Sequence, residues 1–423
     1  MSDFDSKDFF TDPSFIPDPH PFFDHHRSQC PVKRLEASQN VIAVTGFDEC
    51  LEVLRNTAAF SNIVAPIGPF PGLPFEPQGT DISAQIDEHR EQFPMFEHLV
   101  TMDPPRHSRH RRLLSGLFTP RRLEENEQFM WELADRQIDE FHSSGAVEML
   151  NGYAQPFALL TVADLLGVPK EDHDEFRVYL NAQKVGAMEE GDRLTRNPLE
   201  FLDEKFTSYL EDRRSSPRGD SLTQLANAKF PDGSTPEIVE LVRLATFLFA
   251  AGQDTTARLM TSAFRQIAEF PDLQKQLRED RTLIPQFVEE ILRMEGPVKS
   301  DFRLARTATS LGDVEIPAGS VVMVSLPAAN RDPRRFEDPH EFRMDRANSK
   351  EHVAFGRGVH SCPGAPLSRV EARVTIERML DRMDDIAISE TAHGPADDRR
   401  YTYEPTYILR GLIELHLEFN PVP

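Results

Sequence analysis

The chain has 423 residues, of which 39% are hydrophobic and 28% are charged, so it can bury a sizeable core. A formal net charge of −23 excludes a protein that binds nucleic acid through its overall charge. Its three cysteines are widely spaced and form no disulfide framework, and neither a secretory signal nor an uninterrupted apolar stretch of about 18 residues is visible, so we expect a cytoplasmic protein without a membrane anchor.

The first quarter of the chain is predicted to combine short strands with loops. Residues 1–30 are rich in Pro and Phe and are expected to be irregular. Apolar stretches at 32–35 and 41–44 flank a polar turn and predict two strands, and 47–54 predicts a helix. Residues 61–96 hold many Pro, Gly and Phe, which predicts a long loop of the kind that is usually functional or disordered.

The middle of the chain, from about residue 106 to 296, is predicted to be overwhelmingly helical. Its longest helix would begin at Ser234-Thr-Pro-Glu, where a capping hydroxyl precedes a proline. It would end near Glu269 and span about 50 Å. Residues 241–251 are apolar on nearly every side, which predicts that this helix is buried. Another helix is predicted at 284–295.

The last part of the chain returns to short strands. These are predicted at 314–316, 320–324 and 412–419, between Gly and Pro residues, and a helix is predicted at 365–383. Since both ends of the chain contribute strands, the sequence predicts a large helical body with a small β region.

One segment departs from the acidic background. From Pro104 to Arg122 the chain has no acidic residue and six arginines, namely Arg106, Arg109, Arg111, Arg112, Arg121 and Arg122. The charge pattern alone leaves two interpretations open, a solvated face and a site for an anionic group.

The stretch Phe355-Gly-Arg-Gly-Val-His-Ser-Cys362-Pro-Gly364 carries the clearest chemical signal. Its glycines allow tight turns and a close approach to a flat ligand. Cys362 precedes a predicted helix, whose free N–H groups favour a thiolate. No second Cys or His lies at zinc-like spacing. A buried structural cysteine and a cofactor ligand are the alternatives, and the glycine-rich context favours the ligand.

A polar motif, Ala250-Ala-Gly252-Gln-Asp254-Thr255-Thr256, interrupts the apolar middle of the long helix. Glycine and consecutive threonines are poor helix formers, and a threonine hydroxyl that bonds to the preceding turn bends a helix. Such breaks are expected at functional sites. Asp254 beside Thr255 can relay protons to a bound group, and a packing kink with a satisfied carboxylate is the alternative.

Glu290 and Arg293 share a helix face, which taken alone indicates an ordinary structural pair. The order and separation of the Asp254-Thr255 motif, the Glu290-x-x-Arg293 pair and the Cys362 stretch resemble the cytochrome P-450 family. The resemblance extends from about Phe47 onward.

This resemblance implies the family's mainly α fold with a small β region, a triangular prism with a long central helix over the haem. It implies one domain over 1–423, with a β-rich lobe from about 30–60 and 300–420 and a helical lobe from about 100–296 and 363–383. The implied activity is that of a bacterial haem-thiolate monooxygenase, which inserts one atom of O₂ into a small, largely hydrophobic substrate. Its cofactor would be haem b, and its electrons would come from an acidic ferredoxin and an NAD(P)H-dependent ferredoxin reductase.

The resemblance also assigns roles at the haem. Cys362 would be the axial ligand of the iron, with Phe355, Gly356 and Gly364 around it. Asp254 and Thr255 would serve the opposite face and help to deliver protons to dioxygen. The propionates would meet His107, Arg111, Arg303 and His360.

Other roles lie farther from the iron. Glu290 and Arg293 would form a buried ion pair that pins the loop before Cys362, with Arg331 as a third member. Outward-facing arginines, including Arg109, Arg112 and Arg357, would dock the ferredoxin. The substrate contacts would be Phe96, Phe247, Ala250, Ala251, Lys299, Tyr407 and Ile408.

Two other functions stay open, a non-catalytic haem-thiolate sensor or carrier and a peroxide-driven peroxygenase. The Asp254-Thr255 pair favours the monooxygenase, because binding alone needs no proton relay and peroxygenases usually replace this pair. Lys299 departs from the family pattern, since its position is more often apolar. It would pair with Asp301, face solvent or meet a substrate carboxylate.

Overall fold

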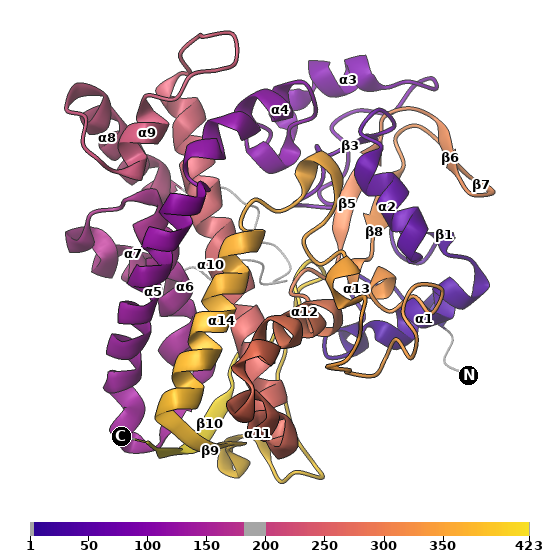
Figure 1. Cartoon of the computed structure of the whole chain (residues 1–423). Coiled ribbons are helices and arrows are strands. Elements are labelled where there is room, and N and C mark those ends of the chain that lie inside the picture. Colours follow the sequence, from indigo (N-terminus) through magenta and orange to yellow (C-terminus); the bar gives the residue numbers. More distant parts are fainter. Residues whose placement is uncertain (1–3, 182–199, 423) are drawn as a thin grey trace. The chain divides into compact units, whose positions relative to one another are not determined.

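The computed structural model describes residues 4–181 and 200–422 (Figure 1). The chain divides into two compact units. Unit 1 is drawn from residues 1–111, 292–362 and 406–410, and unit 2 from 112–291, 363–405 and 411–423. Helices predominate and the sheets are small, as the sequence predicts.

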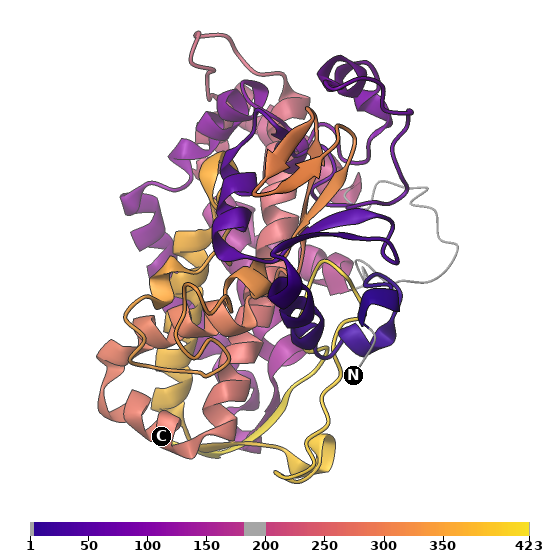
Figure 2. The ribbon, with the colours of Figure 1, turned by 90° about the vertical axis from the view of Figure 1, so that its right-hand side faces the viewer.

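Unit 1 contains a five-stranded sheet in the order β1-β2-β8-β5-β3. The strands are β1 (Val32–Leu35), β2 (Val41–Val44), β3 (Phe60–Ser61), β5 (Asp301–Ala305) and β8 (Val321–Val324). β2 pairs with β8 in parallel, and the other pairs are antiparallel. In Figure 2 the indigo N-terminal strands and the orange strands from beyond residue 300 therefore lie side by side.

Both faces of this sheet are covered, which is why all four residues of β2 are buried. Ile42 and Val44 join one hydrophobic cluster, whereas Val41 and Ala43 join another, as the twofold alternation of a strand requires. The first cluster includes residues of α2 (Phe47–Arg55), and the second includes aromatic residues from the N-terminal segment.

The sequence analysis missed two α-helices in the first quarter of the chain. These are α1 (His20–Gln29), in the segment expected to be irregular, and the short α3 (Ser83–Glu88), in the predicted long loop. Phe22 and Phe23 of α1 are buried in the core, so tertiary packing stabilises a helix with little periodicity of its own. Unit 1 also holds α4 (Arg106–Arg111), α13 (Leu326–Ala329) and a hairpin of β6 (Thr309–Leu311) with β7 (Val314–Ile316).

Unit 2 is built around α10 (Ile238–Glu269), which packs against α6 (Gln155–Leu166), α8 (Glu200–Ser215) and α14 (Ala365–Arg382) (Figure 1). The predicted start of α10 was wrong. Glu237 is the N-cap and forms a capping box with Glu240, so Pro236 lies before the helix. A Cβ at Gly252 would approach Val162 Cγ2 of α6 to 3.0 Å, so this glycine permits close helix packing.

The other helices of unit 2 surround these. They are α5 (Pro120–Phe141), α7 (His173–Asn181), α9 (Ser221–Ala226), α11 (Pro271–Glu279), α12 (Ile284–Glu295, whose last four residues are assigned to unit 1) and α15 (Glu390–His393). None of the helices described is long and apolar enough to cross a lipid bilayer.

A three-stranded sheet in the order β4-β10-β9 completes unit 2. Its strands are β4 (Ala146–Glu148), β9 (Met383–Ile388) and β10 (His416–Pro421). The strand predicted at 412–419 therefore begins four residues before β10 begins and ends two residues before β10 ends, and β4 was missed inside the region predicted to be helical. β4 has only three residues and pairs with β10, about 270 positions later in the chain, so it has no periodic pattern of its own.

Candidate functional site

The loop before α14 holds Cys362 in a fixed backbone conformation. The Cys362 amide donates to the Phe355 carbonyl oxygen at 2.9 Å. Gly356 and Gly358 have positive φ angles of 65° and 77°, which favour glycine. A Cβ at Gly358 would also lie 2.6 Å from the Leu54 carbonyl oxygen, so this glycine permits the loop to pack on α2.

The environment of Cys362 differs from that of the other two cysteines. Cys362 is exposed, Cys30 is half-buried, and Cys50 is fully buried, which raises its pKa well above the usual value. The alternative of a buried structural cysteine is thus wrong for Cys362. An exposed sulfur on a constrained loop is suited to binding a partner atom. Gly364, the N-cap of α14, follows two residues later.

Four basic side chains from separate segments of unit 1 gather beside this loop. His107 and Arg111 come from α4, Arg303 from β5, and His360 from the turn before Cys362. The rings of His107 and His360 are 3.9 Å apart at their centroids. Arg111 Nη2 donates to the Ser361 carbonyl oxygen at 2.7 Å. The structure therefore brings together all four residues predicted to contact the propionates.

The electrostatics of this cluster indicate an anion site. Burial lowers the pKa of His107 to about 4, and the positive charge of Arg111 is the next largest cause. Burial and the positive charges of His107, Arg303 and Arg111 lower the pKa of His360 to about 2. Both ring nitrogens of His107 and Nε2 of His360 are buried and lack a hydrogen-bond partner among the described residues. The carboxylates of a haem, which accept strong hydrogen bonds from cations, fit such a donor set.

The other arginines predicted to face outward differ in their exposure and contacts. Arg109 and Arg112 are exposed, as a docking surface requires. Arg122 instead contacts the Asp164 carboxylate at 3.0 Å, and Arg121 contacts Glu125 at 2.9 Å. Arg357 is half-buried and donates to the carbonyl oxygens of residues 351 and 352. The prediction that all the remaining arginines face outward was therefore wrong for Arg122 and Arg357.

The polar motif of α10 makes two local contacts within unit 2. Thr255 Oγ1 donates to the Ala251 carbonyl oxygen at 2.9 Å, which is the predicted bond to the preceding turn. Arg258 Nε donates to Asp254 Oδ2 at 2.8 Å, and Arg258 Nη2 lies 3.4 Å from Glu404 Oε2. The sequence analysis missed Arg258, although its position four residues after Asp254 is a usable signal.

A buried carboxyl group next to this motif was also missed. Glu371 of α14 is fully buried, and burial raises its pKa to about 8, while the hydroxyl of Thr256 opposes that rise. Thr256 Oγ1 also donates to Ser368 Oγ at 3.3 Å, so α10 and α14 share a polar contact inside an apolar interface. At neutral pH Glu371 is therefore protonated and uncharged.

We expect Glu371→Gln to stabilise the protein increasingly as pH rises from 5 to 8. The unfolded chain releases the Glu371 proton near pH 4.5 and the folded chain near pH 8, so wild-type stability falls as pH rises through this window. Because these two pKa values differ by more than three, the free energy of unfolding of Glu371→Gln should exceed that of wild type by about 4 kcal/mol at pH 8. The two proteins should differ little at pH 5. Urea unfolding at both pH values measures it.

The control for this prediction is Glu377→Gln. Glu377 lies on the same helix and is half-buried, with its carboxylate 3.4 Å from Arg373. This substitution should produce no comparable gain at pH 8. An equal change in stability at pH 5 and pH 8 for Glu371→Gln would contradict the buried, protonated state.

Arg293 and Glu290 are both fully buried on α12. The Arg293 guanidinium donates to the carbonyl oxygens of Asn330 and Pro339 at 2.9 and 2.8 Å and packs 5.3 Å from the centroid of the Phe336 ring. Arg293 thus fixes the segment that follows α13. Arg331 pairs with Glu295 at 3.7 Å.

The predicted substrate contacts fall into two sets, one in each unit. In unit 1 the Lys299 amide donates to the Ile408 carbonyl oxygen at 2.7 Å, and Tyr407, Ile408 and Phe96 pack against one hydrophobic cluster. In unit 2, Phe247, Ala250 and Ala251 lie on α10. Two expectations for Lys299 were wrong: its side chain is buried, and Asp301 instead accepts from Arg303 at 2.7 Å.

Comparisons with known proteins agree with these features. The family model described as Cytochrome P450 matches residues 186–400. Cytochrome P450 144 of Mycobacterium tuberculosis is 33% identical over 393 residues, which cover 91% of this chain and 87% of that protein. The 6-deoxyerythronolide B hydroxylase of Saccharopolyspora erythraea is 29% identical over 391 residues, which cover 92% of each.

A solved structure extends the similarity to the fold. Mycobacterium marinum cytochrome P450 CYP150A6 in the substrate-free form is 62% identical, and the alignment covers 99% of this chain and 100% of that chain with a TM-score of 0.94. The chain therefore belongs to the cytochrome P450 family of haem-dependent monooxygenases.

Proposed function

We propose that this protein binds haem b through Cys362 and inserts one atom of O₂ into a small hydrophobic substrate. The observation that carries the proposal is the arrangement in unit 1, where an exposed cysteine on a constrained loop neighbours four basic side chains. Two of these, His107 and His360, have buried ring nitrogens without a hydrogen-bond partner among the described residues. A cysteine thiolate on the iron supplies the electron density that favours O–O cleavage.

Other residues of the chain would have separate roles in binding haem and in moving protons. His107, Arg111, Arg303 and His360, which lie together in unit 1, would hold the haem carboxylates by hydrogen bonds. Thr255 already donates its hydroxyl proton to Ala251, so its oxygen is left to accept a hydrogen bond from an incoming donor. Arg258 holds the Asp254 carboxylate, which takes up and releases a proton at its oxygens.

Three functional classes are separated by one set of assays. A monooxygenase forms product with O₂, a ferredoxin, its reductase and NAD(P)H, and its O₂ consumption depends on substrate. A peroxygenase forms product with hydrogen peroxide alone, and a sensor or carrier binds ligand without product. Failure of the first assay with every ferredoxin supplied, together with product formation from peroxide, would overturn the proposal.

An acidic ferredoxin is the electron donor that fits the exposed arginines. We expect the double variant Arg109→Glu, Arg112→Glu to slow reduction by the ferredoxin by about tenfold or more at low salt, because complementary charge raises encounter rates. Stopped-flow reduction at increasing ionic strength measures the effect, which should shrink with salt. The control is Arg121→Glu, at an exposed arginine of the same segment that lies 2.9 Å from Glu125. Equal rates for wild type and the double variant would contradict this docking surface.

We further propose that the substrate carries an anionic group, which Lys299 binds. The Lys299 side chain is buried, its Nζ lies 5.8 Å from the centroid of the Phe9 ring, and it has no carboxylate partner among residues 4–181 and 200–422. Burial, and the charge of Arg410, lower its pKa to about 8. The hydroxyl of the adjacent buried Ser300 also lacks a partner there. A ligand carboxylate would satisfy the Lys299 ammonium.

We expect Lys299→Met to weaken binding of a hydrophobic acid by about tenfold or more and to leave binding of its neutral amide nearly unchanged. Titrations that follow the haem spin state give both affinities. For wild type, affinity for the acid should fall as pH rises above about 8, where Lys299 loses its proton. Equal changes for the acid and the amide would exclude the carboxylate role.

A further inference from the structure

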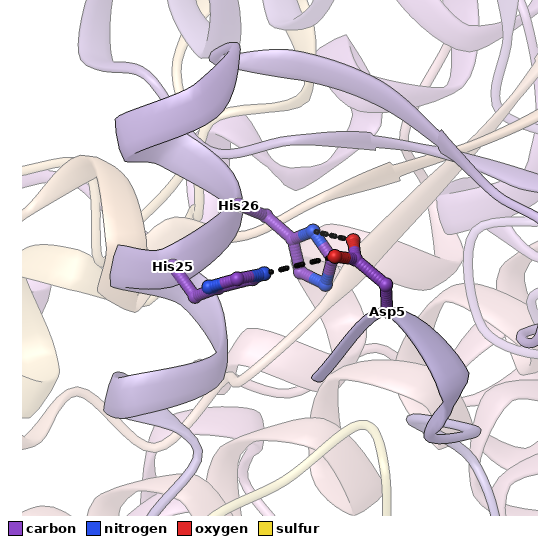
Figure 3. A group of neighbouring side chains, drawn as sticks. All are labelled: Asp5, His25 and His26. Carbon is purple, nitrogen blue, oxygen red and sulfur yellow. Dashed lines mark hydrogen bonds and ion pairs between the residues drawn. The ribbon is translucent and has the colours of Figure 1, made fainter. Parts of the chain in front are cut away.

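Three potential metal ligands converge in the N-terminal segment of unit 1. Asp5 lies in a single turn, Phe4–Ser6, and His25 and His26 lie on the last part of α1. Figure 3 shows both imidazole rings directed at the Asp5 carboxylate from the helix. None of these residues belongs to the candidate functional site described above.

The separations of the ligand atoms suit a small divalent cation. His25 Nε2 lies 3.3 Å from Asp5 Oδ2, and His26 Nδ1 lies 3.8 Å from Asp5 Oδ1. One ligand atom from each residue can be chosen so that all three lie within 4.8 Å of one another. Bonds of about 2.0–2.2 Å to a tetrahedral ion require donors about 3.3 Å apart, so small side-chain movements complete the geometry.

The state of His26 is the second observation that indicates a ligand. Its side chain is only 2% exposed, and neither ring nitrogen has a partner at hydrogen-bond geometry among the described residues, although the Phe4 backbone and the Asp5 carboxylate lie near the ring. A buried imidazole without a well-formed hydrogen bond is unfavourable. A metal ion bound at Nδ1 would remove that penalty, and Asp5, with its side chain 49% exposed, leaves a path for the ion from solvent.

The surroundings also contain a competitor for the carboxylate. Lys33 Nζ lies 2.5 Å from Asp5 Oδ1 and also donates to Gln29 Oε1. Gln29 Nε2 lies 2.8 Å from His25 Nε2. A cation at this position must displace the Lys33 ammonium from Asp5 and the Gln29 amide from His25.

We propose that Asp5, His25 and His26 form a structural site for a divalent cation of the zinc class, which ties the N-terminal turn to α1. Two imidazoles and one carboxylate are a donor set that zinc accepts readily. The turn already contributes Phe4, whose ring packs 6.2 Å from that of Phe22 and 5.4 Å from that of His25, measured between centroids. The cation would stabilise this packing.

The test is equilibrium dialysis of the tag-free haem protein, treated with a chelator, against Zn²⁺. Wild type should bind about one ion per chain, and bound Zn²⁺ should slow amide exchange in residues 4–29. Asp5→Asn and His25→Ala should each abolish both effects. These two residues are preferred to the buried His26 because their side chains are 49% and 29% exposed, so folding is little disturbed.

Two further variants sharpen the result. Lys33→Met should tighten binding by about threefold, because it removes the competing ion pair. His340→Ala is the matched control, since His340 forms another exposed His–Asp pair, 3.1 Å from Asp24, and its loss should change nothing. The proposal is overturned if Zn²⁺ does not bind, if Asp5→Asn and His25→Ala bind like wild type, or if Lys33→Met binds more weakly.

Discussion

The Cys362→Ser variant is expected to lose the red-shifted Soret band that the reduced wild-type protein shows under carbon monoxide, and to lose turnover entirely. Serine keeps the size of the side chain and the backbone bond to Phe355, but its hydroxyl does not ionise as a thiol does and is a poor ligand for haem iron. The absorption spectrum of the reduced carbon monoxide complex measures this directly.

Cys30→Ser is the matched control for this experiment. Cys30 is a half-buried free cysteine directly after α1, and its replacement should leave the carbon monoxide spectrum and turnover as in wild type. A red-shifted band that persists in Cys362→Ser would exclude this cysteine as the axial ligand, and the proposed function would be abandoned with it.

The Asp254→Asn variant is expected to form product about 10²–10³-fold more slowly than wild type. Asparagine preserves the shape of the side chain and a hydrogen bond to Arg258, but it cannot take up and release a proton at its oxygen. The rate of product formation with saturating substrate and ferredoxin measures the loss, and a larger solvent isotope effect should accompany it.

Two observations keep this prediction specific. The carbon monoxide spectrum and the substrate-induced spin shift should stay as in wild type, because Asp254 is proposed to move protons and not to bind haem or substrate. Asp272→Asn, at an exposed aspartate in the first turn of α11, should leave the rate unchanged. A wild-type rate for Asp254→Asn would exclude a proton-transfer role.

Sequence reasoning was most successful where neighbouring residues decide the outcome. The predicted bounds are correct for the end of α10 at Glu269, for the whole of α12 and for the strands β1 and β2. Periodicity and flanking helix- or strand-breaking residues are local signals. The elements that sequence reasoning missed include α1, α3, β4 and β5. These elements are short and are stabilised by distant partners, as β4 is by β10.

The sequence by itself indicated the family, and it is the basis for proposing Cys362 as the axial ligand. The motifs behind both inferences act through neighbouring backbone, so their chemistry can be read along the chain. They are the glycines at 356 and 358 with the cysteine four residues after the second, and the Asp254-Thr255 pair on α10.

Only the tertiary structure decided which charged and polar groups are buried and what they face. Burial raises the pKa of Glu371 and removes Lys299 from solvent. It also leaves both ring nitrogens of His107 and Nε2 of His360 without a hydrogen-bond partner in the described part of the chain, and none of these states leaves a local pattern in the sequence. The physical reason is that loss of water and the proximity of other charges depend on packing between segments that lie far apart in the chain. His107, Arg303 and His360 meet for that reason alone.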